Sequence, residues 1–234
     1  MPKYYKYIPF GRSNSRRRKW TMDIFRNNRI YLGHFNELND PMEAMFNASE
    51  LTNYQIQQIK LKKPNIVIGC FSKTYSDVLM WTHYADNHLG CCVEFEIIEG
   101  DYLEPITYDT QIVNPSEAGL LEQCIDILTH KLSPWQYEQE VRYLKVIDPE
   151  STNRYLSINI TKVYLGSKLT QKSVNHYKQL ISRYSPDVDI QQVQIDELTW
   201  WNGEVNSILV RLYCCSFHIL AISSPPPQKK NQVA

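Results

Sequence analysis

The pattern of hydrophobic positions predicts a set of short strands. Tyr4 to Phe10 alternates between apolar and polar residues, as a strand with one buried face does, and Arg29 to Gly33 is expected to form a second strand. A near-continuous hydrophobic run at Ile66 to Phe71 predicts a buried strand, and Cys91 to Ile97 predicts another. A hairpin-like segment is expected at 104–109, and further strands at 136–146, 162–165 and 191–195.

Apolar residues three and four positions apart predict the helices. The longest candidate runs from Ser116 to Leu132, and Ser76 is expected to cap a helix from Asp77 to about Asn87. Other helices are expected at 15–28, 42–46, 49–63 and 170–184. Because strands and helices are mixed in order and no internal repeat is visible, we predict an α+β fold, with a central mixed or antiparallel sheet and helices packed on it.

Composition indicates a single domain. The chain has 234 residues and is 43% hydrophobic, which is enough for a substantial core, and no shift in composition divides it. We therefore expect one α+β domain at 1–222 and a disordered, proline-rich tail at 223–234. The apolar segment at 208–222 is too short to span a bilayer, so buried strands are expected there and no membrane association.

Charge and cysteine content indicate which ligands and which cellular compartment to expect. The formal net charge is zero, so no general electrostatic field favours nucleic acid, although the basic run RSNSRRRKW at 12–20 could contact phosphates or be a solvated helix start. The six cysteines have no spacing that suits zinc. With no apolar signal segment at the N-terminus, free thiols in a reducing, cytoplasmic setting are expected.

The strongest candidate for chemistry is PWQYEQEVRY at 134–143. If 136–146 forms a strand, Glu138, Glu140 and Arg142 share one face. Two close carboxylates repel each other unless a cation or a substrate lies between them. We predict that this row lines one wall of a cleft, with Trp135 at its edge. The alternative is a solvated strand face with a Glu–Arg ladder.

Three further groups are candidates for substrate contacts. Lys6 lies among the tyrosines of KYYKY, where it suits an anionic ligand or protects an edge strand. Asn39 and Asp40 precede a proline, where they either contact a ligand or cap a helix. Ser72 follows a buried strand, a position at which loops often present functional side chains.

The segment MWTHYADNHLG at 80–90 is a fourth candidate. Helical spacing would place Tyr84 and His88 one turn apart. We predict that both face the cleft while Trp81 packs into the core, and that His88 is a pH-sensitive polar contact rather than a metal ligand. Ordinary core packing of this stripe is the alternative.

A known family is resembled by a series of motifs that occur in this order: KYYKY, RIYLGHFNELNDPME, IGCFSKT, LMWTHYADNHLGCCVEF, ITYD, WQYEQEVRYL and VYLG. That family is the bacterial one catalogued as domain of unknown function 2971, and the similarity covers about residues 4–166. The resemblance implies a toxin, effector or accessory protein of bacterial phage defence, acting with a partner protein of the same system. The motif residues that the resemblance carries over also include Glu43, Glu94 and Tyr108.

A second resemblance, to ADP-ribosyltransferases, concerns mechanism. Those enzymes present a basic residue on the first strand, a serine on a middle strand and an E-x-E motif on a late strand. This chain has Lys6, Ser72 and Glu138-x-Glu140 in that order. It departs from the pattern because no arginine lies on the first strand and the serine lacks the S-T-S form.

The ADP-ribosyltransferase resemblance implies that NAD is the substrate. Glu140 would stabilise the oxocarbenium-like transition state, and Glu138 would orient or deprotonate a protein or nucleic-acid acceptor. Lys6 or Arg142 would pair with the pyrophosphate, and Tyr84 or Trp81 would stack on nicotinamide.

Two alternatives from other classes remain open. A metal-dependent nuclease would use Asp40, Glu43, Glu138 and Glu140 as magnesium ligands, with the basic run holding nucleic acid, although no compact D-x-D spacing is present. A non-enzymatic partner-binding module would use the tyrosine-rich surface, since the chain has 16 tyrosines and tyrosine is favoured at interfaces.

Overall fold

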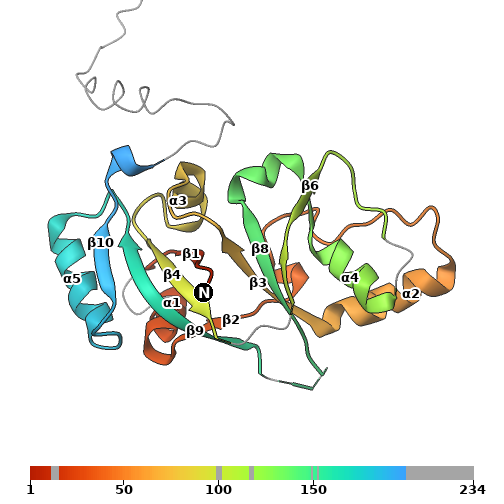
Figure 1. The fold of residues 1–234 in the computed structure, drawn as a ribbon, viewed down its shortest axis with the longest axis horizontal. Coiled ribbons are helices and arrows are strands. Elements are labelled where there is room, and N and C mark those ends of the chain that lie inside the picture. The colour runs from red at the N-terminus through yellow and green to blue at the C-terminus, as the bar shows by residue number, and fades with distance from the viewer. Residues whose placement is uncertain (12–15, 99–101, 116–118, 149, 152, 199–234) are drawn as a thin grey trace, which may run out of the picture. The chain divides into compact units, whose positions relative to one another are not determined.

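The structure is a computed structural model that describes residues 1–11, 16–98, 102–115, 119–148, 150–151 and 153–198 (Figure 1). All of these residues belong to one compact unit, Met1–Trp201. The strands expected at 208–222 and the tail expected at 223–234 lie outside the described residues. Within the described part of the chain, no helix combines the length and the hydrophobicity that crossing a bilayer requires.

Strands and helices are mixed along the chain. The helices are α1 (Arg16–Asn27), α2 (Asn53–Lys62), α3 (Val78–Tyr84), α4 (Leu120–Leu128) and α5 (Gln171–Ser182), with short 3-10 helices η1 (Phe35–Glu37), η2 (Lys63–Asn65), η3 (Ser133–Glu138) and η4 (Ile195–Glu197). The strands are β1 (Tyr4–Ile8), β2 (Arg29–Tyr31), β3 (Ile66–Ser72), β4 (Cys91–Ile97), β5 (Tyr102–Pro105), β6 (Thr107–Asp109), β7 (His130–Leu132), β8 (Glu140–Val146), β9 (Tyr155–Leu165) and β10 (Asp189–Gln192).

One large sheet forms the centre of the molecule. Its strand order is β10-β9-β4-β1-β3-β8-β5, and β2 pairs with β9. All its pairs are antiparallel except β10 with β9. Strands β6 and β7 form a separate parallel pair. A mostly antiparallel sheet with helices around it is an α+β fold, as the sequence predicts.

The middle strand, β1, pairs unequally with its two neighbours. It is in register with β4 from Tyr4 to Ile8, but it meets β3 only where Tyr5 lies opposite Ser72. The two halves of the sheet therefore separate on either side of this single contact, which leaves the edge-facing groups of β3 and β1 available to other partners.

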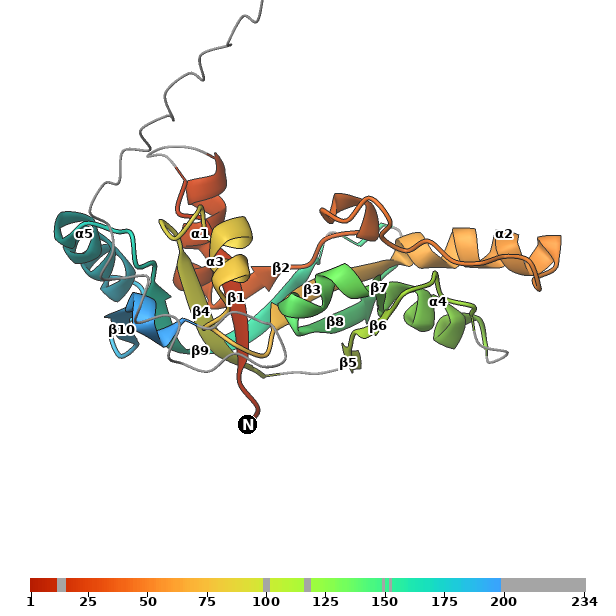
Figure 2. The same ribbon diagram turned by 90° about the horizontal axis from the view of Figure 1, so that it is seen from above.

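Buried side chains form three clusters around the sheet. One packs α1 and α5 against alternate residues of β4 and β9, including Val93 and Val163. On the opposite face of the same strands, Cys92 and Tyr164 pack with Trp81 of α3. The third cluster joins α2 and α4 to β3 and β8. Figure 2 shows the same division, with α1, α3 and α5 beside β4 and β9, and α2 and α4 toward the other end.

The predicted strands β1 to β4 are confirmed with small shifts at their ends. The segment expected at 162–165 is the end of the longer β9, and the one expected at 191–195 is β10. The helix expected from Asp77 to about Asn87 is confirmed at its start but ends at Tyr84. Its cap is Asp77 rather than Ser76, because Asp77 Oδ1 accepts from the amides of Leu79 and Met80 at 2.8 and 2.9 Å.

The helix expected at 42–46 is wrong. The Asp40 side chain accepts from the Met42 amide at 2.9 Å and the Asp40 carbonyl accepts from the Glu43 amide at 3.0 Å, which closes a turn. Ala44 then adopts a φ of 58°, a left-handed conformation that a helix cannot continue through.

The helix expected at 116–132 is also too long at its C-terminal end. Helix α4 ends at Leu128, and residues 130–132 form β7, because they pair with β6. The segment 104–109 is not a hairpin, since β5 pairs with β8 while β6 pairs with β7. Each of these outcomes depends on pairing between distant segments.

Gly166 provides a test of the packing between β9 and the loop after α3. A Cβ atom at this position would lie 2.1 Å from the carbonyl oxygen of His88, whereas one at Gly33 would meet only the flexible Glu37 carboxylate, at 3.1 Å. We expect Gly166→Ala to lower the free energy of unfolding by about 2 kcal/mol or more, and Gly33→Ala by less than about 1 kcal/mol. Urea unfolding of both variants measures this difference, and equal losses would contradict it.

Candidate functional site

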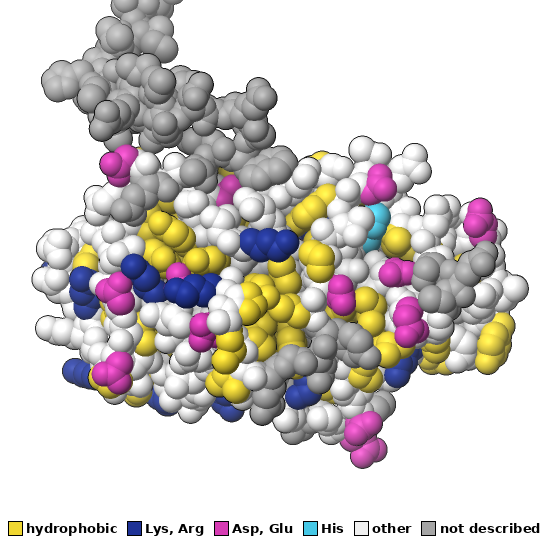
Figure 3. All heavy atoms as spheres, in the orientation of Figure 1, with side chains coloured by type: hydrophobic (Ala, Val, Ile, Leu, Met, Phe, Trp, Pro, Cys, Tyr) yellow, Lys and Arg dark blue, Asp and Glu magenta, His cyan; other side chains and the backbone are white. Residues whose placement is uncertain are grey.

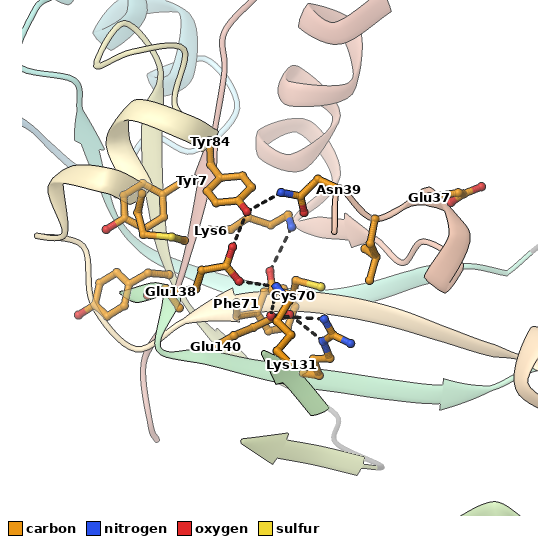
Figure 4. A pocket seen from close by; sticks show the side chains of 15 residues that line it. Lys6, Tyr7, Glu37, Asn39, Cys70, Phe71, Tyr84, Lys131, Glu138 and Glu140 are labelled. Carbon is orange, nitrogen blue, oxygen red and sulfur yellow. Dashed lines mark hydrogen bonds and ion pairs between the residues drawn. The ribbon is translucent and has the colours of Figure 1, made fainter. Parts of the chain in front are cut away.

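A cavity of about 230 Å³ lies where β1 and β3 diverge. It is lined by side chains from seven elements or their flanking turns (Figure 4). The apolar lining residues include Leu38, Phe71 and Met80, and the charged and polar ones include Lys6, Asn39, Ser72, Tyr84, Lys131, Glu138, Glu140 and Arg142. The structure therefore brings most of the candidate residues together, from positions as far apart in the sequence as 6 and 142.

Strand register aligns the centre of the site. Ser72 lies between Tyr5 of β1 and Glu140 of β8, so three adjacent strands contribute to one cross-strand row. Two residues along, Cys70 lies opposite Arg142. Directly paired residues in antiparallel strands share a face, so Glu140 and Arg142 of β8 project from the same face of the sheet as Ser72 and Cys70 of β3.

Strand β8 begins at Glu140, not at residue 136 as expected. Glu138 is instead the last residue of η3, and Gln139 turns the chain with a φ of 44°. Glu138 nevertheless lines the cavity beside Glu140 and Arg142. The turn, rather than a shared strand face, brings it there.

Arg142 is fully buried, and protein groups surround its guanidinium. Its Nε donates to Glu140 at 2.8 Å, and Nη1 and Nη2 donate to the two Glu43 oxygens at 2.6 and 2.8 Å. The remaining donors reach the Leu128 carbonyl at 2.5 Å and Glu140 at 3.4 Å. Because all five N–H directions have acceptors, Arg142 holds the two carboxylates in place rather than presenting a free fork to a substrate.

Lys131, on β7, is the cation that lies between the two glutamates of the E-x-E motif. Its Nζ is 2.5 Å from Glu138 and 2.8 Å from Glu140, and it also lies 5.1 Å from the centre of the Trp135 ring. The lysine is buried, so both contacts act with little screening by solvent. The repulsion expected between the two carboxylates is removed by a protein side chain.

Glu138 is also joined to α3 and to the turn after η1. The Tyr84 hydroxyl donates to the other Glu138 oxygen, and the Asn39 amide donates to that hydroxyl at 2.7 Å. Figure 4 shows this chain running from Asn39 through Tyr84 to the carboxylate. Tyr84 and Asn39 thus lie in the site as predicted, with Tyr84 bonded to the E-x-E motif.

The two glutamates have pKa values shifted in opposite directions. Burial raises the pKa of Glu138, and the pull of Lys131 only partly offsets this. Burial acts on Glu140 in the same sense, but the charges of Arg142 and Lys131 outweigh it and hold the pKa of Glu140 below its usual range. Paired carboxyl groups with separated pKa values are typical of sites in which one stays charged and the other exchanges a proton.

Lys6 and Ser72 complete the cavity wall from β1 and β3. Lys6 Nζ donates to the Cys70 carbonyl at 3.2 Å, and it has no carboxylate partner among the described residues. Ser72 is buried, and its hydroxyl accepts from the Thr74 amide at 3.2 Å. Among the three cations of the cavity, Lys6 is therefore the one placed to meet an anionic ligand.

Two predicted residues do not line the cavity. Asp40 is buried in the turn at 40–43, where its carboxylate caps the Met42 amide. His88 lies outside the cavity because α3 ends at Tyr84 and residues 86–88 all have positive φ, so the helical spacing behind that prediction does not hold. Its ring contacts Thr82 and Ser167 at 3.3 Å and stacks on Trp81, while burial and Lys168 lower its pKa. Trp81 is fully buried, as predicted.

Another buried carboxylate, Glu94, holds the wall of the cavity that β1 provides. It accepts from Lys3 at 2.7 Å, Thr161 at 2.8 Å, Tyr164 at 3.1 Å and Tyr5 at 3.2 Å. Since Tyr5 lines the cavity, this cluster fixes the position of β1 on β4 and β9.

The geometry does not favour a magnesium site built from the predicted ligands. Glu43, Glu138 and Glu140 are bonded to Arg142 and Lys131, and Asp40 lies in its turn. Within the described residues, no group of three or more histidine, cysteine, aspartate or glutamate side chains is placed to hold a metal ion.

Lys131 is the site residue that the sequence does not reveal. The expected helix at 116–132 would have placed it on a helical surface, and only its pairing in β7 turns it toward the motif. The signal that could have indicated such a residue is charge balance, because E-x-E-x-R has two acids and one base. That signal does not say which lysine supplies the missing charge.

Comparisons of the chain with family models, with curated proteins and with solved structures find no match. The two resemblances given by the motifs therefore stay predictions.

Lys131→Met tests whether the cluster depends on this cation. We expect the variant to lose about 3–5 kcal/mol of unfolding free energy at pH 7, because two buried carboxylates remain without their shared partner. The pKa of Glu138, already raised, would rise further. A carboxyl with a raised folded pKa costs stability above its unfolded value, so the loss should shrink as the pH falls toward about 4.

Urea unfolding between pH 4 and pH 7 measures this dependence. Lys145→Met is the matched control, because Lys145 lies on β8 but is only half-buried and has no ion pair among the described residues. We expect that control to change stability by less than about 0.5 kcal/mol. A pH-independent loss in Lys131→Met would show that packing, not charge, is what the lysine contributes.

Proposed function

We propose that this protein cleaves NAD and transfers ADP-ribose, with a fold of the ADP-ribosyltransferase kind. The observation that supports this most is the row of residues across β1, β3 and β8. Tyr5 of β1, Ser72 of β3 and Glu140 of β8 lie side by side in that row, at the point where the sheet divides, and Lys6, the next residue on β1, lines the same cavity. The sequence order on which the proposal rests thus corresponds to neighbouring positions in space.

The charge of the carboxylate cluster beside the cavity also suits this chemistry. Breaking the bond between nicotinamide and ribose produces positive charge on the ribose, which buried anions stabilise. Three carboxylates, Glu43, Glu138 and Glu140, share two cations, Arg142 and Lys131. The cluster therefore has an excess of negative charge when all its groups are ionised.

The two glutamates then have different roles. Glu140, whose pKa is held low, stays anionic and stabilises the ribose cation. The nicotinamide leaves with the electron pair of the broken bond. An acceptor oxygen or nitrogen bonds to the ribose carbon and releases its proton to Glu138, whose raised pKa favours accepting it. With water as the acceptor, the product is ADP-ribose.

The size of the cavity limits what can enter. At about 230 Å³ it is smaller than the pockets that enclose drug-sized ligands, which are about 300–1,000 Å³. We infer that it receives the nicotinamide and its ribose, with Tyr84 beside the ring, while the pyrophosphate stays at the mouth near Lys6. Arg142 positions Glu43 and Glu140, and Ser72 lies opposite Glu140 on the neighbouring strand.

The series of sequence motifs is the basis for the family and the biological role that we propose. We propose that the chain is a cytoplasmic member of the bacterial family catalogued as domain of unknown function 2971, acting in phage defence on a protein or nucleic-acid acceptor. Its Asn39, Tyr84 and Glu138 lie in one hydrogen-bonded chain, so these motif residues have a common structural purpose.

Glu140→Gln and Glu138→Gln test the two roles. With labelled NAD, we expect Glu140→Gln to release nicotinamide at least about a hundredfold more slowly, because the charge stabilising the transition state is lost. Glu138→Gln should reduce transfer to an acceptor in a host lysate more than it reduces NAD hydrolysis. Separating nicotinamide release from label transfer measures both effects.

Glu96→Gln is the control, because Glu96 lies on β4 outside the cavity lining. Glu140→Gln also removes an ion-pair partner of Arg142, so each variant is assayed below its own melting temperature. Wild-type protein that binds no NAD in calorimetry, releases no nicotinamide and labels nothing in the lysate would rule the proposal out. A thermal shift with Mg²⁺ but not NAD would instead favour the nuclease alternative.

A further inference from the structure

Helix α1 concentrates positive charge in a chain whose formal net charge is zero. Its 12 residues include four arginines and a lysine, while Asp23 is its one acid and is bonded to Arg29 at 2.9 Å. Arg16, Arg17, Lys19 and Arg26 are exposed. Among the described residues, none of Arg16, Arg17 and Lys19 has an acidic partner. By contrast, the face in Figure 3 mixes acidic and basic side chains.

An exposed tryptophan lies within this basic surface. Trp20 is 65% exposed, the most exposed of the large aromatic side chains on α1 and its neighbours. It borders a hollow of about 500 Å³ whose other walls include Arg18, Lys19, Arg26 and Tyr155. A large ring open to solvent beside several cations has an unused face on which another ring can stack.

Two arginines of α1 pack against tyrosine rings from other parts of the chain. Arg18 lies 5.5 Å from the Tyr177 ring centre, and Arg26 lies 5.0 Å from that of Tyr184. These contacts hold the guanidinium groups against flat aromatic surfaces instead of leaving them on freely moving chains. The surface thus combines ordered cations with the open ring of Trp20.

This combination fits single-stranded nucleic acid better than a lipid surface. A helix that inserts into a membrane presents a continuous apolar face to it. The apolar residues of α1, Met22, Ile24 and Phe25, are buried in the core, so Trp20 alone remains outside. Phosphates paired with cations, and an unpaired base stacked on an aromatic ring, are the interactions that bind single strands.

The surface also continues toward the cavity. A second hollow, of about 450 Å³, is lined by Arg17 together with Tyr7 and Tyr84, and these two tyrosines also line the cavity. A nucleic-acid strand bound at the Arg17 end of α1 would therefore lie near Tyr84, which is bonded to Glu138 of the E-x-E motif.

We infer that the basic face of α1, formed by Arg16, Arg17, Lys19, Trp20 and Arg26, binds single-stranded nucleic acid. The phosphates contact the cations, and a base stacks on Trp20. This inference does not depend on the proposed cleavage of NAD, because a strand can bind here whether or not the cavity is catalytic.

Fluorescence anisotropy of a labelled single-stranded oligothymidine, titrated with the full chain, tests it. Four neutralised phosphates give a log–log salt slope of about −3 for a single strand. Arg16→Glu with Arg17→Glu should weaken binding by about tenfold or more and halve the slope. Trp20→Ala should weaken binding by about 5-fold to 100-fold with little change in slope, because stacking is not a charge interaction.

Helix α2 supplies matched controls. Lys60→Glu with Lys62→Glu changes the net charge by the same amount as the α1 double variant, and Tyr54→Ala removes another exposed aromatic side chain, 73% exposed. These controls should bind like the wild type. All exposed-site variants are checked for an unchanged melting temperature.

Three results would overturn the inference. The first is no binding of the oligonucleotide at low salt. The second is an equal loss of affinity in the α1 and α2 variants, which would mean that net charge alone drives binding. The third is tighter binding to phosphatidylserine vesicles that the oligonucleotide does not displace, which would assign the surface to a membrane.

Discussion

The buried guanidinium of Arg142 is the group around which the centre of this protein is arranged. Taking a charge out of water costs several kcal/mol unless partners replace its hydration. Here Glu140, Glu43 and the Leu128 carbonyl supply all the acceptors. Each partner comes from a different part of the chain, so the strand β8, the turn at 40–44 and the end of α4 must be in place together. The need to pair this one buried cation thereby fixes the positions of these three parts of the chain.

The same requirement shapes the site. With both of its carboxylate oxygens bonded to Arg142 and Lys131, Glu140 stays charged, while the partners of Glu138 among the described residues are Lys131 and the Tyr84 hydroxyl. The asymmetry of cations around two neighbouring carboxylates separates their pKa values. The same ion pairs therefore stabilise the fold and separate the pKa values of the two glutamates. A substitution that changes one of these properties also changes the other.

The division of the sheet at β1 makes this network accessible. Strand β1 pairs with β4 along its whole length, whereas it meets β3 only where Tyr5 lies opposite Ser72. A single contact at Ser72 instead leaves a cavity over the row. The Glu94 cluster holds β1 to the other half of the sheet, so the opening is maintained by bonds on its far side.

The sequence by itself determined the local elements and the class of the fold. Hydrophobic periodicity placed β1, β3, β4, α3 and α5 closely, because each is stabilised by a pattern that neighbouring residues supply. It also placed Glu140 and Arg142 on one face, since the period of a strand is two.

Only the tertiary structure decided which groups meet across the chain. Lys131 reaches the E-x-E motif because residues 130–132 pair with β6 instead of continuing a helix, and His88 turns away because its backbone adopts positive φ. Local patterns set the energy of a turn or a strand, but the pairing of distant segments and the neutralisation of buried charge depend on contacts that no window of sequence contains.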